Sequence, residues 1–232
     1  MRAGQDFPAQ LERLLADDKN ARIKVLNLGF NGEGAYSFTQ TLGDYDYLDA
    51  DLVVLYSGYN DLGPNYYNFR HRSPVFAWTG YLPLLPSLTV DKISAWRQQS
   101  NGENAKVVFP PPHLDELKTS PSQRIESMTC SPKWQFYCER IVGVTELALA
   151  KGKRVLIVGE PYLTDNHVEQ QIELEKMLAY RFQGEPRVRY LNLGRVVDLR
   201  DTSLCWDGMH LTEEGNRRIA AALRQPALEM LR

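Results

Sequence analysis

The chain has 232 residues, of which 43% are hydrophobic and 24% are charged, and its formal net charge is −2. This length suits one α/β domain with a sizeable core. The near-neutral balance provides no global attraction to nucleic acid or to an anionic membrane, and no run of about 18 apolar residues could span a bilayer. We therefore expect a globular protein without a nucleic-acid partner and without a membrane span in this chain.

Apolar runs and helical periodicity alternate along the chain. Helices are predicted near residues 6–17, 35–43, 133–150 and 166–183, with a last helix from about Thr212. Strands are predicted at residues 23–29, 51–58, 153–160 and 188–194. The nearly all-apolar run at 51–58 is typical of a strand in a parallel sheet that is covered on both faces. The alternation predicts an α/β fold with a doubly wound parallel sheet.

Residues 62–132 interrupt this alternation. The stretch carries most of the chain's 13 prolines and many aromatic residues. So long an insertion after the end of a strand usually builds a wall or a lid over a site. We predict a single domain over residues 1–232, with this stretch as its insertion.

Cysteine usage and targeting signals leave the compartment open. Three cysteines do not make a disulfide framework, and Cys130 and Cys138 are compatible with either a disulfide or a reduced pair. No signal peptide is visible in the chain. The localisation is therefore unknown, and an upstream signal or anchor stays open.

Three short stretches place chemistry-bearing residues after strands, where open α/β sheets bind their ligands. In NLGFNGEG, Gly32 can present a backbone N–H in a tight turn before a helix, although a plain structural turn is an equal alternative. In SGYND, the Asn60 carboxamide could donate to a developing oxyanion or simply form a turn. In CWDGMH, Asp207 can orient the ring of His210, which can then act as a general base.

Together, the glycine turn, the G-x-N-D motif and the D-G-x-H motif resemble the SGNH (GDSL-type) hydrolase family. The resemblance runs from the first residues to about residue 223, apart from the insertion. It implies a flavodoxin-like, three-layer α/β/α fold and a serine ester hydrolase of the esterase, lipase or carbohydrate O-deacetylase type. It also implies that Gly32 and Asn60 form an oxyanion hole and that Asp207 and His210 are the orienter and the base of a Ser-His-Asp triad.

The serine of that triad has no counterpart in the chain. In the family it ends a strand just ahead of a helix like the one predicted at 6–17, and Met1 already stands after that point. Ser37 and Ser57 read as structural residues within a helix and a strand. Cys205 lies so close before its own orienter that it would need an unusual geometry to act as the nucleophile. We expect the serine to lie upstream of Met1 and the chain as given to be inactive.

The missing strand is also a folding problem. In the flavodoxin-like strand order 2-1-3-4-5, it lies between the strands predicted at 23–29 and 51–57. Without it these two strands would stand roughly 9–10 Å apart, each with unpaired backbone groups. We therefore expect a truncated N-terminus, in which the sequence begins at an internal methionine or is a fragment of a longer chain.

Two other functions stay open. A non-catalytic descendant of the same fold could bind acyl or glycan ligands, and a nucleotide-binding flavodoxin-like module is a more distant alternative without a phosphate loop. The expected partner is a small-molecule, glycan or lipid ester, and neither a cofactor nor a metal is expected. Tyr59, Tyr66 and Tyr67 are the candidate substrate-binding residues, although the aromatic residues of the insertion could equally pack it onto the sheet. The sequence leaves the oligomeric state unknown.

Overall fold

The structure is a computed structural model that describes residues 4–16, 23–30, 32–62, 78–79 and 129–232. The chain divides into two compact units, Met1–Tyr66 with Pro110–Arg232 and Tyr67–Phe109. The second unit lies inside the predicted insertion, and Trp78 and Thr79 are its described residues. The helices, strands and contacts that follow belong to the first unit.

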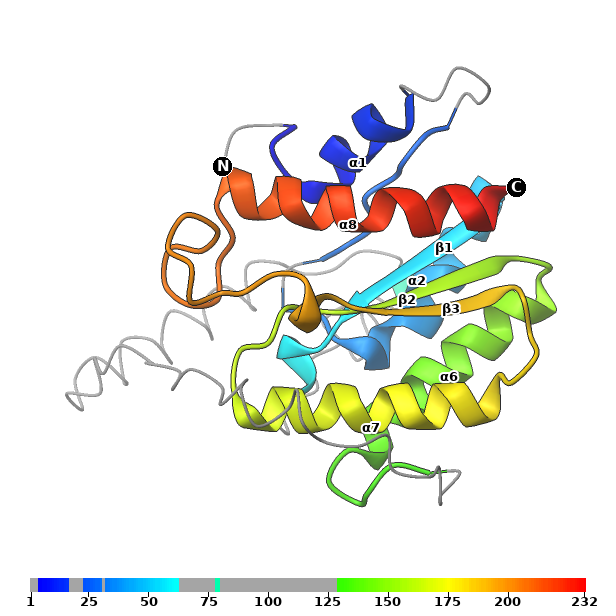
Figure 1. The fold of residues 1–232 in the computed structure, drawn as a ribbon. Helices are drawn as coiled ribbons and strands as arrows, with labels where there is room; N and C mark the ends of the chain where they lie inside the picture. Colours follow the sequence, from blue (N-terminus) through cyan, green and yellow to red (C-terminus); the bar gives the residue numbers. More distant parts are fainter. Residues whose placement is uncertain (1–3, 17–22, 31, 63–77, 80–128) are drawn as a thin grey trace. The chain divides into compact units, whose positions relative to one another are not determined.

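Helices and strands alternate through the described residues (Figure 1). The α-helices are α1 (Phe7–Ala16), α2 (Phe38–Asp44), α6 (Gln135–Ala150), α7 (Asp165–Arg181) and α8 (Glu213–Leu231). The strands are β1 (Leu52–Ser57), β2 (Arg154–Gly159) and β3 (Val188–Asn192). The short 3-10 helices are η1 (Ala35–Ser37), η2 (Asp46–Leu48), η3 (Tyr59–Asp61) and η4 (Leu193–Arg195). These positions confirm all the predicted helices and every predicted strand except the first.

The strands form one parallel sheet in the order β1-β2-β3. Ser57 pairs with Gly159, and Gly159 pairs with Asn192, so the carboxyl ends of the strands are aligned. The chain therefore leaves all of them at the same edge of the sheet. The predicted α/β fold with a parallel sheet is confirmed at this level.

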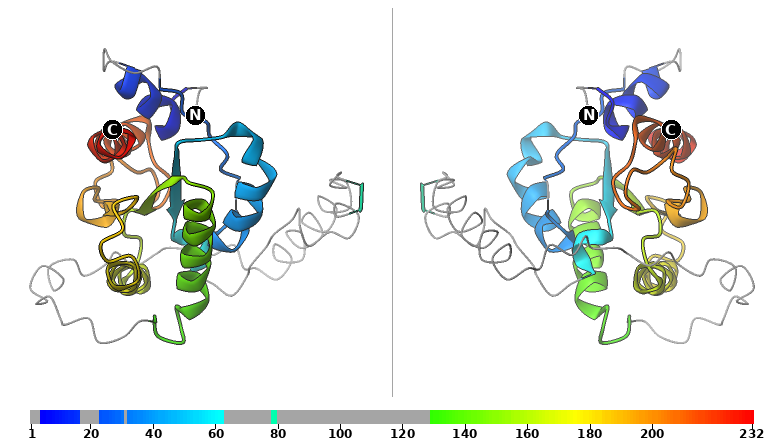
Figure 2. Two further views of the ribbon diagram at one scale, coloured as in Figure 1. Left: turned by 90° about the vertical axis from the view of Figure 1, so that its right-hand side faces the viewer. Right: turned by 90° about the vertical axis from the view of Figure 1, so that its left-hand side faces the viewer.

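Helices cover both faces of the sheet (Figure 2). The side chains of the buried strand β2 pack against helices on both faces. Leu156 and Val158 lie in one core cluster with α1 and α8. Val155 and Ile157 pack in a second cluster with α6 and α7. A strand that is buried on both faces needs apolar side chains at successive positions, which explains its composition.

The first helix is tied to both the last helix and the sheet. The N–H of Phe7 donates to Oδ1 of Asn216 at 3.0 Å, across 209 positions of sequence. Nε of Arg224 donates to the carbonyl of Leu14, also at 3.0 Å. The ring of Phe7 lies 4.8 Å from that of Tyr56 on β1, centroid to centroid. Residues near both ends of the chain thus build one face of the core.

The strand predicted at residues 23–29 is wrong, because the structure has no strand over residues 23–30. Ile23 and Val25 do pack against the cluster of α1 and α8. The apolar side chains that follow are exposed: Leu26 at 59%, Leu28 at 39% and Phe30 at 42%. A strand exists only by its ladder of hydrogen bonds, and the described part of the sheet ends at β1. The apolar pattern is present in this segment, but no strand of the described residues pairs with it.

Among the described residues, β1 has a free outer edge. The carbonyls of Asp51 and Ser57 accept hydrogen bonds from the N–H groups of Arg154 and Glu160, on the side of β2. In a parallel ladder, alternate residues direct their backbone groups to opposite sides. The N–H and C=O groups that point away from β2 are therefore those of Leu52, Val54 and Tyr56. These groups form an unpaired edge, which proteins usually cover.

A disulfide joins Cys130 to Cys138. The sequence alone had left open whether these two cysteines are bonded or reduced. Cys138 lies in the first turn of α6, and Cys130 lies just before this helix. Both cysteines are buried in the cluster of α6 and α7 beside Trp134. The bond therefore ties the entry of α6 to the core.

Candidate active site

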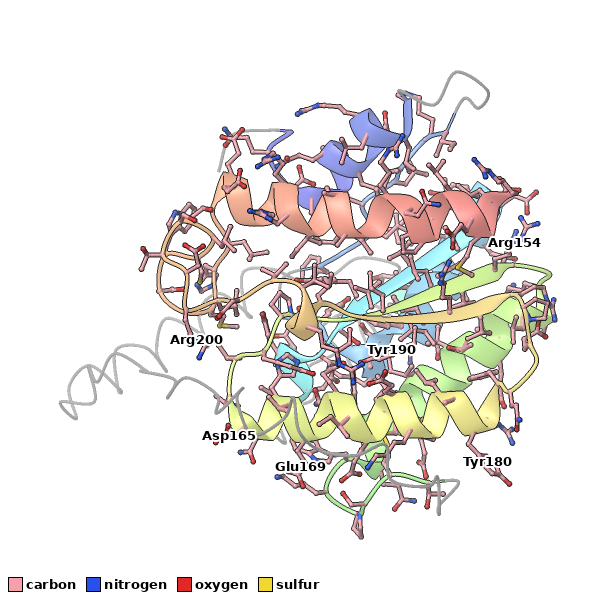
Figure 3. The ribbon with its side chains drawn as sticks, viewed as in Figure 1. Arg154, Asp165, Glu169, Tyr180, Tyr190 and Arg200 are labelled. Atoms are coloured by element: carbon pink, nitrogen blue, oxygen red, sulfur yellow. A yellow bond between two sulfur atoms is a disulfide. The ribbon has the colours of Figure 1, made fainter. Side chains whose placement is uncertain are left out.

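The motif residues lie at one end of the sheet. In Figure 1 the strands run toward the left, and η3 and the loop between β3 and α8 lie at that end. Figure 3 marks the same end with Arg200 and the opposite end with Arg154. A pocket of about 320 Å³ opens beside Arg154 and Arg189, away from the motifs. Since ligands of parallel sheets collect at the carboxyl ends of the strands, the motif end is the candidate site.

A small hairpin over residues 205–211 carries the predicted base. Cys205 and Leu211 form an antiparallel bridge, and the N–H of Trp206 donates to the carbonyl of His210 at 2.9 Å. The Cys205 side chain is 2% exposed and packs in the cluster of α1 and α8. The hairpin is therefore anchored on the core by one of its faces.

Asp207 and His210 are hydrogen-bonded at the tip of this hairpin. Oδ2 of Asp207 lies 2.7 Å from Nδ1 of His210, and Oδ1 accepts from the backbone N–H groups of His210 at 2.8 Å and Met209 at 3.0 Å. Gly208 between them has φ of 86°, a conformation that glycine adopts without steric cost. The D-G-x-H spacing thus forms the pair that it predicts.

The electrostatics of this pair favour an ionised carboxylate. The backbone hydrogen bond from His210, followed by the bond from its ring, lowers the pKa of Asp207 to about 2. An anion beside Nδ1 holds the ring proton on that nitrogen and leaves Nε2 as the atom that can accept another proton. The side chain of His210 is 66% exposed, so an incoming group can reach it.

The glycine turn and Asn60 are adjacent in space. Nδ2 of Asn60 donates to the carbonyl of Glu33 at 2.9 Å. The N–H of Glu33 donates in turn to the carbonyl of Phe30 at 3.2 Å, and Gly32 inside this turn has φ of 78°. A carboxamide has two N–H donors, so one donor of Asn60 remains for a ligand. Gly32 and Asn60, the two predicted oxyanion donors, therefore lie on either side of the backbone of Glu33.

Asp61 clamps the other side of the same turn, a role that the sequence prediction missed. Both carboxylate oxygens of Asp61 accept from the N–H of Ala35, at 3.0 and 3.1 Å. A Cβ on Gly34 would lie only 2.5 Å from Oδ1 of Asp61, so glycine is what lets the carboxyl group approach. Burial raises the pKa of Asp61 to about 7. The G-x-N-D motif thus holds the glycine turn by two successive side chains.

Glu160 supports η3 from the neighbouring strand and was also missed. It follows β2 directly and accepts a hydrogen bond from the backbone N–H of Tyr59. Burial raises the pKa of Glu160 to about 8, and the nearby Asp61 adds to the rise. A glutamate immediately after the apolar run of β2 was the signal available in the sequence.

A buried polar layer packs beneath η3. Nδ1 of His167 accepts from the N–H of Leu163 at 3.2 Å, and burial lowers the pKa of His167 to about 3. Nε2 of Gln171 lies 3.2 Å from Nε2 of His167, and Oε1 of Gln171 accepts from the hydroxyl of Tyr190 at 2.8 Å. Figure 3 shows Tyr190 between the sheet and α7. The ring of His167 is fully buried and its Nδ1 is taken up by the backbone, so His167 is read as a structural residue.

Tyr59 links the two halves of the site. Its hydroxyl donates to the carbonyl of Pro161 at 2.7 Å, and its ring meets that of His167 edge-on at 5.0 Å. It packs against the same core cluster as Cys205 and Leu211 of the hairpin. The hydroxyl is thus engaged within the protein, and a substrate-binding role for Tyr59 stays a prediction. Tyr66 and Tyr67 lie outside the described residues.

The alternative nucleophiles are engaged or buried. Oγ of Ser37 donates to the carbonyl of Gly34 at 2.9 Å, and Oγ of Ser57 lies 3.1 Å from the hydroxyl of Tyr137. Both serines are buried. Cys205 is a free thiol that points into the core. As the sequence predicts, both serines read as structural residues.

Comparison with protein-family models, curated proteins and solved structures gave no match. Among the described residues, no group of three or more His, Cys, Asp or Glu side chains is arranged to hold a metal ion. No helix in the same part of the chain combines the length and the apolar character needed to cross a membrane. The fold and the site therefore define an α/β protein with an oriented Asp-His pair at the carboxyl edge of its sheet.

Proposed function

We propose that this chain is the larger part of a serine ester hydrolase of the SGNH type, and that its serine lies on a segment N-terminal to Met1. The observation that carries the proposal is the Asp207–His210 pair, in which an ionised carboxylate holds Nδ1 of an exposed imidazole at 2.7 Å. An exposed ion pair contributes little to stability. An oriented ring with a free Nε2 is, however, what general-base catalysis requires.

In the proposed reaction, Nε2 of His210 takes the proton of the serine hydroxyl while the serine oxygen attacks the acyl carbon of the ester. Asp207 stabilises the imidazolium that forms. His210 then gives this proton to the departing alcohol, which leaves an acyl-enzyme. In the second half, His210 takes a proton from the water that attacks the acyl group and returns it to the serine oxygen.

Each half of this reaction passes through a tetrahedral oxyanion. In the proposal, the backbone N–H of Gly32 and the second amide N–H of Asn60 donate to it. The support beneath them favours this role: Asn60 and Asp61 both hold the glycine turn, and Glu160 holds the backbone of η3. Donors that are fixed before the reaction stabilise developing charge without reorganisation.

The placement of the helices supports the flavodoxin-like part of the proposal. The helix α1 packs with α8 on one face of the sheet, whereas η1 and α2 contact α6 on the other. In doubly wound folds the chain changes faces where the strand order reverses, and this is where the site lies. In the proposal, the outer edge of β1 receives the strand that carries the serine, between β1 and residues 23–29.

The test is to express the chain with the residues encoded immediately upstream of Met1 and to assay both forms on short-chain aryl esters and acetylated sugars. We expect turnover by the longer form only, and loss of that turnover in His210→Ala and in the serine-to-alanine variant. Robust turnover by residues 1–232 that disappears in Cys205→Ala would overturn the missing-serine argument. A longer form that folds, carries the serine and stays inactive would favour the non-catalytic binding protein instead.

A further inference from the structure

The hairpin that carries His210 also fixes the position of an exposed tryptophan. Because Cys205 is bridged to Leu211, the next residues inward, Trp206 and His210, stand directly opposite each other. The hydrogen bond from the N–H of Trp206 to the carbonyl of His210, at 2.9 Å, joins these two positions. This backbone bond places Trp206 and His210 side by side at the end of the hairpin.

Both side chains are turned to solvent. Cys205 and Leu211 pack on the core. Trp206, in contrast, is 64% exposed, and the side chain of His210 is 66% exposed. An exposed indole and an oriented imidazole thus lie in the same short hairpin.

Hydrogen bonds hold the backbone of the hairpin that carries the indole. The N–H of Thr212 donates to the carbonyl of Leu204 at 2.9 Å, and its hydroxyl donates to the carbonyl of Ser203 at 2.6 Å. The N–H of Cys205 donates to the carbonyl of Asp201 at 3.2 Å. Both ends of the hairpin are thus tied to the backbone around it.

We propose that Trp206 is a stacking platform for a sugar ring, and that it positions the ester of an acylated carbohydrate over His210. The proposal rests on the hydrolase function inferred above and names its substrate class. An indole face suits the C–H face of a pyranose, while the ring hydroxyls stay in water. An acyl chain needs enclosure instead, and an indole exposed at 64% does not enclose it. The exposed loop that leads into the hairpin is also polar, with Asp201, Thr202 and Ser203.

Binding can be measured on the chain of residues 1–232 without any nucleophile. The probes are cellotetraose, xylotetraose and chitotetraose, each with and without chemical O-acetylation. Their binding is measured by saturation-transfer NMR and by indole fluorescence. We expect at least one probe to bind, Trp206→Ala to weaken its affinity by tenfold or more, and Trp206→Phe to keep it within about threefold of the unmodified chain. Tyr47→Ala removes a comparably exposed aromatic side chain, 76% exposed on η2, and is the matched control.

The outcomes separate this inference from the proposed function. Absence of binding to every probe, or equal binding by Trp206→Ala, overturns the platform. In the longer, serine-containing form, Trp206→Ala should raise KM for an acetylated oligosaccharide at least tenfold while kcat on a small aryl ester changes less than threefold. Hydrolysis by the longer form with an unchanged KM would contradict the role of Trp206 and still support the hydrolase function. Binding that depends on Trp206, without hydrolysis, would support the role of Trp206 and contradict the hydrolase function.

Discussion

Glu160, the residue after β2, accepts a hydrogen bond from the backbone N–H of Tyr59, the residue before Asn60. One strand thereby fixes the turn that follows its neighbour. Burial raises the pKa of this carboxyl group to about 8, so the link is made by a carboxylic acid at neutral pH. The position of the Asn60 amide therefore depends on a buried acid that the motif itself does not contain.

This link predicts how stability changes with pH. The pKa of Glu160 rises from 4.5 to about 8 on folding, and that of Asp61 rises from 3.8 to about 7. The folded protein thus binds more protons than the unfolded chain between these values. Their contribution is complete below about pH 4 and is lost as the pH rises through 7 to 8. The lowered pKa of His167 acts oppositely, since its contribution is lost as the pH falls from 6.5 toward 3.

We expect the melting temperature to fall between pH 6.5 and 8.5. The free energy of unfolding should fall by at most about 1.4 kcal/mol per pH unit for each carboxyl group. Glu160→Gln keeps an acceptor for the N–H of Tyr59 and cannot ionise, so its slope should be shallower. Glu139→Gln on the exposed surface of α6 is the control and should keep the original slope. Melting curves of the three proteins at several pH values provide the measurement. Identical slopes for the original chain and Glu160→Gln would contradict a buried neutral acid at this position.

A second prediction concerns Gly34. Its φ of −113° is open to any residue, but a Cβ there would lie 2.5 Å from Oδ1 of Asp61. Gly34→Ala should therefore push Asp61 off the N–H of Ala35 and destabilise the protein by roughly 1–3 kcal/mol, the usual cost of overpacking. Gly43→Ala in α2 is the matched control, because no atom lies within 4 Å of its Cβ position. It should be neutral or stabilising by up to about 1 kcal/mol.

Urea unfolding of both glycine variants measures these free energies. In the longer, serine-containing form, Gly34→Ala should also lower kcat, because the carbonyl of Glu33 that holds Asn60 moves with the turn. An unaltered midpoint for Gly34→Ala would show that the carboxyl group of Asp61 does not clamp the turn.

Local patterns predicted the helices and three of the four expected strands. The apolar run of β2 and the capping Thr212 of α8 need no knowledge of distant residues, and both are where they were expected. The run at 23–29 is also apolar but forms no strand, and no described strand pairs with it. The apolar pattern of a segment predicts which of its residues are buried. It does not predict whether a neighbouring strand is present to form hydrogen bonds with that segment.

The site divides in the same way. Asp207 and His210 are three positions apart with a glycine between them, so their spacing alone predicts the contact. Glu160 lies 101 positions from Tyr59, and no local pattern connects them. Trp206 is exposed on a hairpin closed by the bridge between Cys205 and Leu211, which the sequence does not mark.

A third prediction concerns catalysis by the longer, serine-containing form. Asn60→Ala should lower kcat by roughly 100- to 1000-fold, the usual loss for one oxyanion donor, with a small change in KM. His210→Ala should cost more, since it removes the base from both halves of the reaction. Tyr47→Ala removes an exposed side chain on η2 that belongs to none of the motifs, and this variant should behave as the original enzyme. Steady-state kinetics on an aryl acetate separates these variants, and an Asn60→Ala enzyme within threefold of the original would remove Asn60 from the oxyanion hole.

The last prediction locates the upstream segment in the sheet. In residues 1–232, the backbone groups of Leu52, Val54 and Tyr56 point to the outer edge of β1, whereas Val53 and Leu55 face β2. Hydrogen exchange should therefore be fast at the first three amides and slow at the other two. If the upstream segment adds a parallel strand there, its ladder will bond to the first three amides. It will also cover Val54, which is 36% exposed, and give residues 23–29 the neighbour that they lack.

We expect the longer form to protect Leu52, Val54 and Tyr56 by at least tenfold, to leave Val53 and Leu55 nearly unchanged, and to melt at a higher temperature. The even-numbered amides report on the new strand, and the odd-numbered amides of the same strand are the internal control for general stabilisation. Equal protection factors in the two forms, with no gain in melting temperature, would show that the upstream segment does not pair with β1. The serine would then have no route to the edge beside Asn60, and the hydrolase proposal would fail along with the strand.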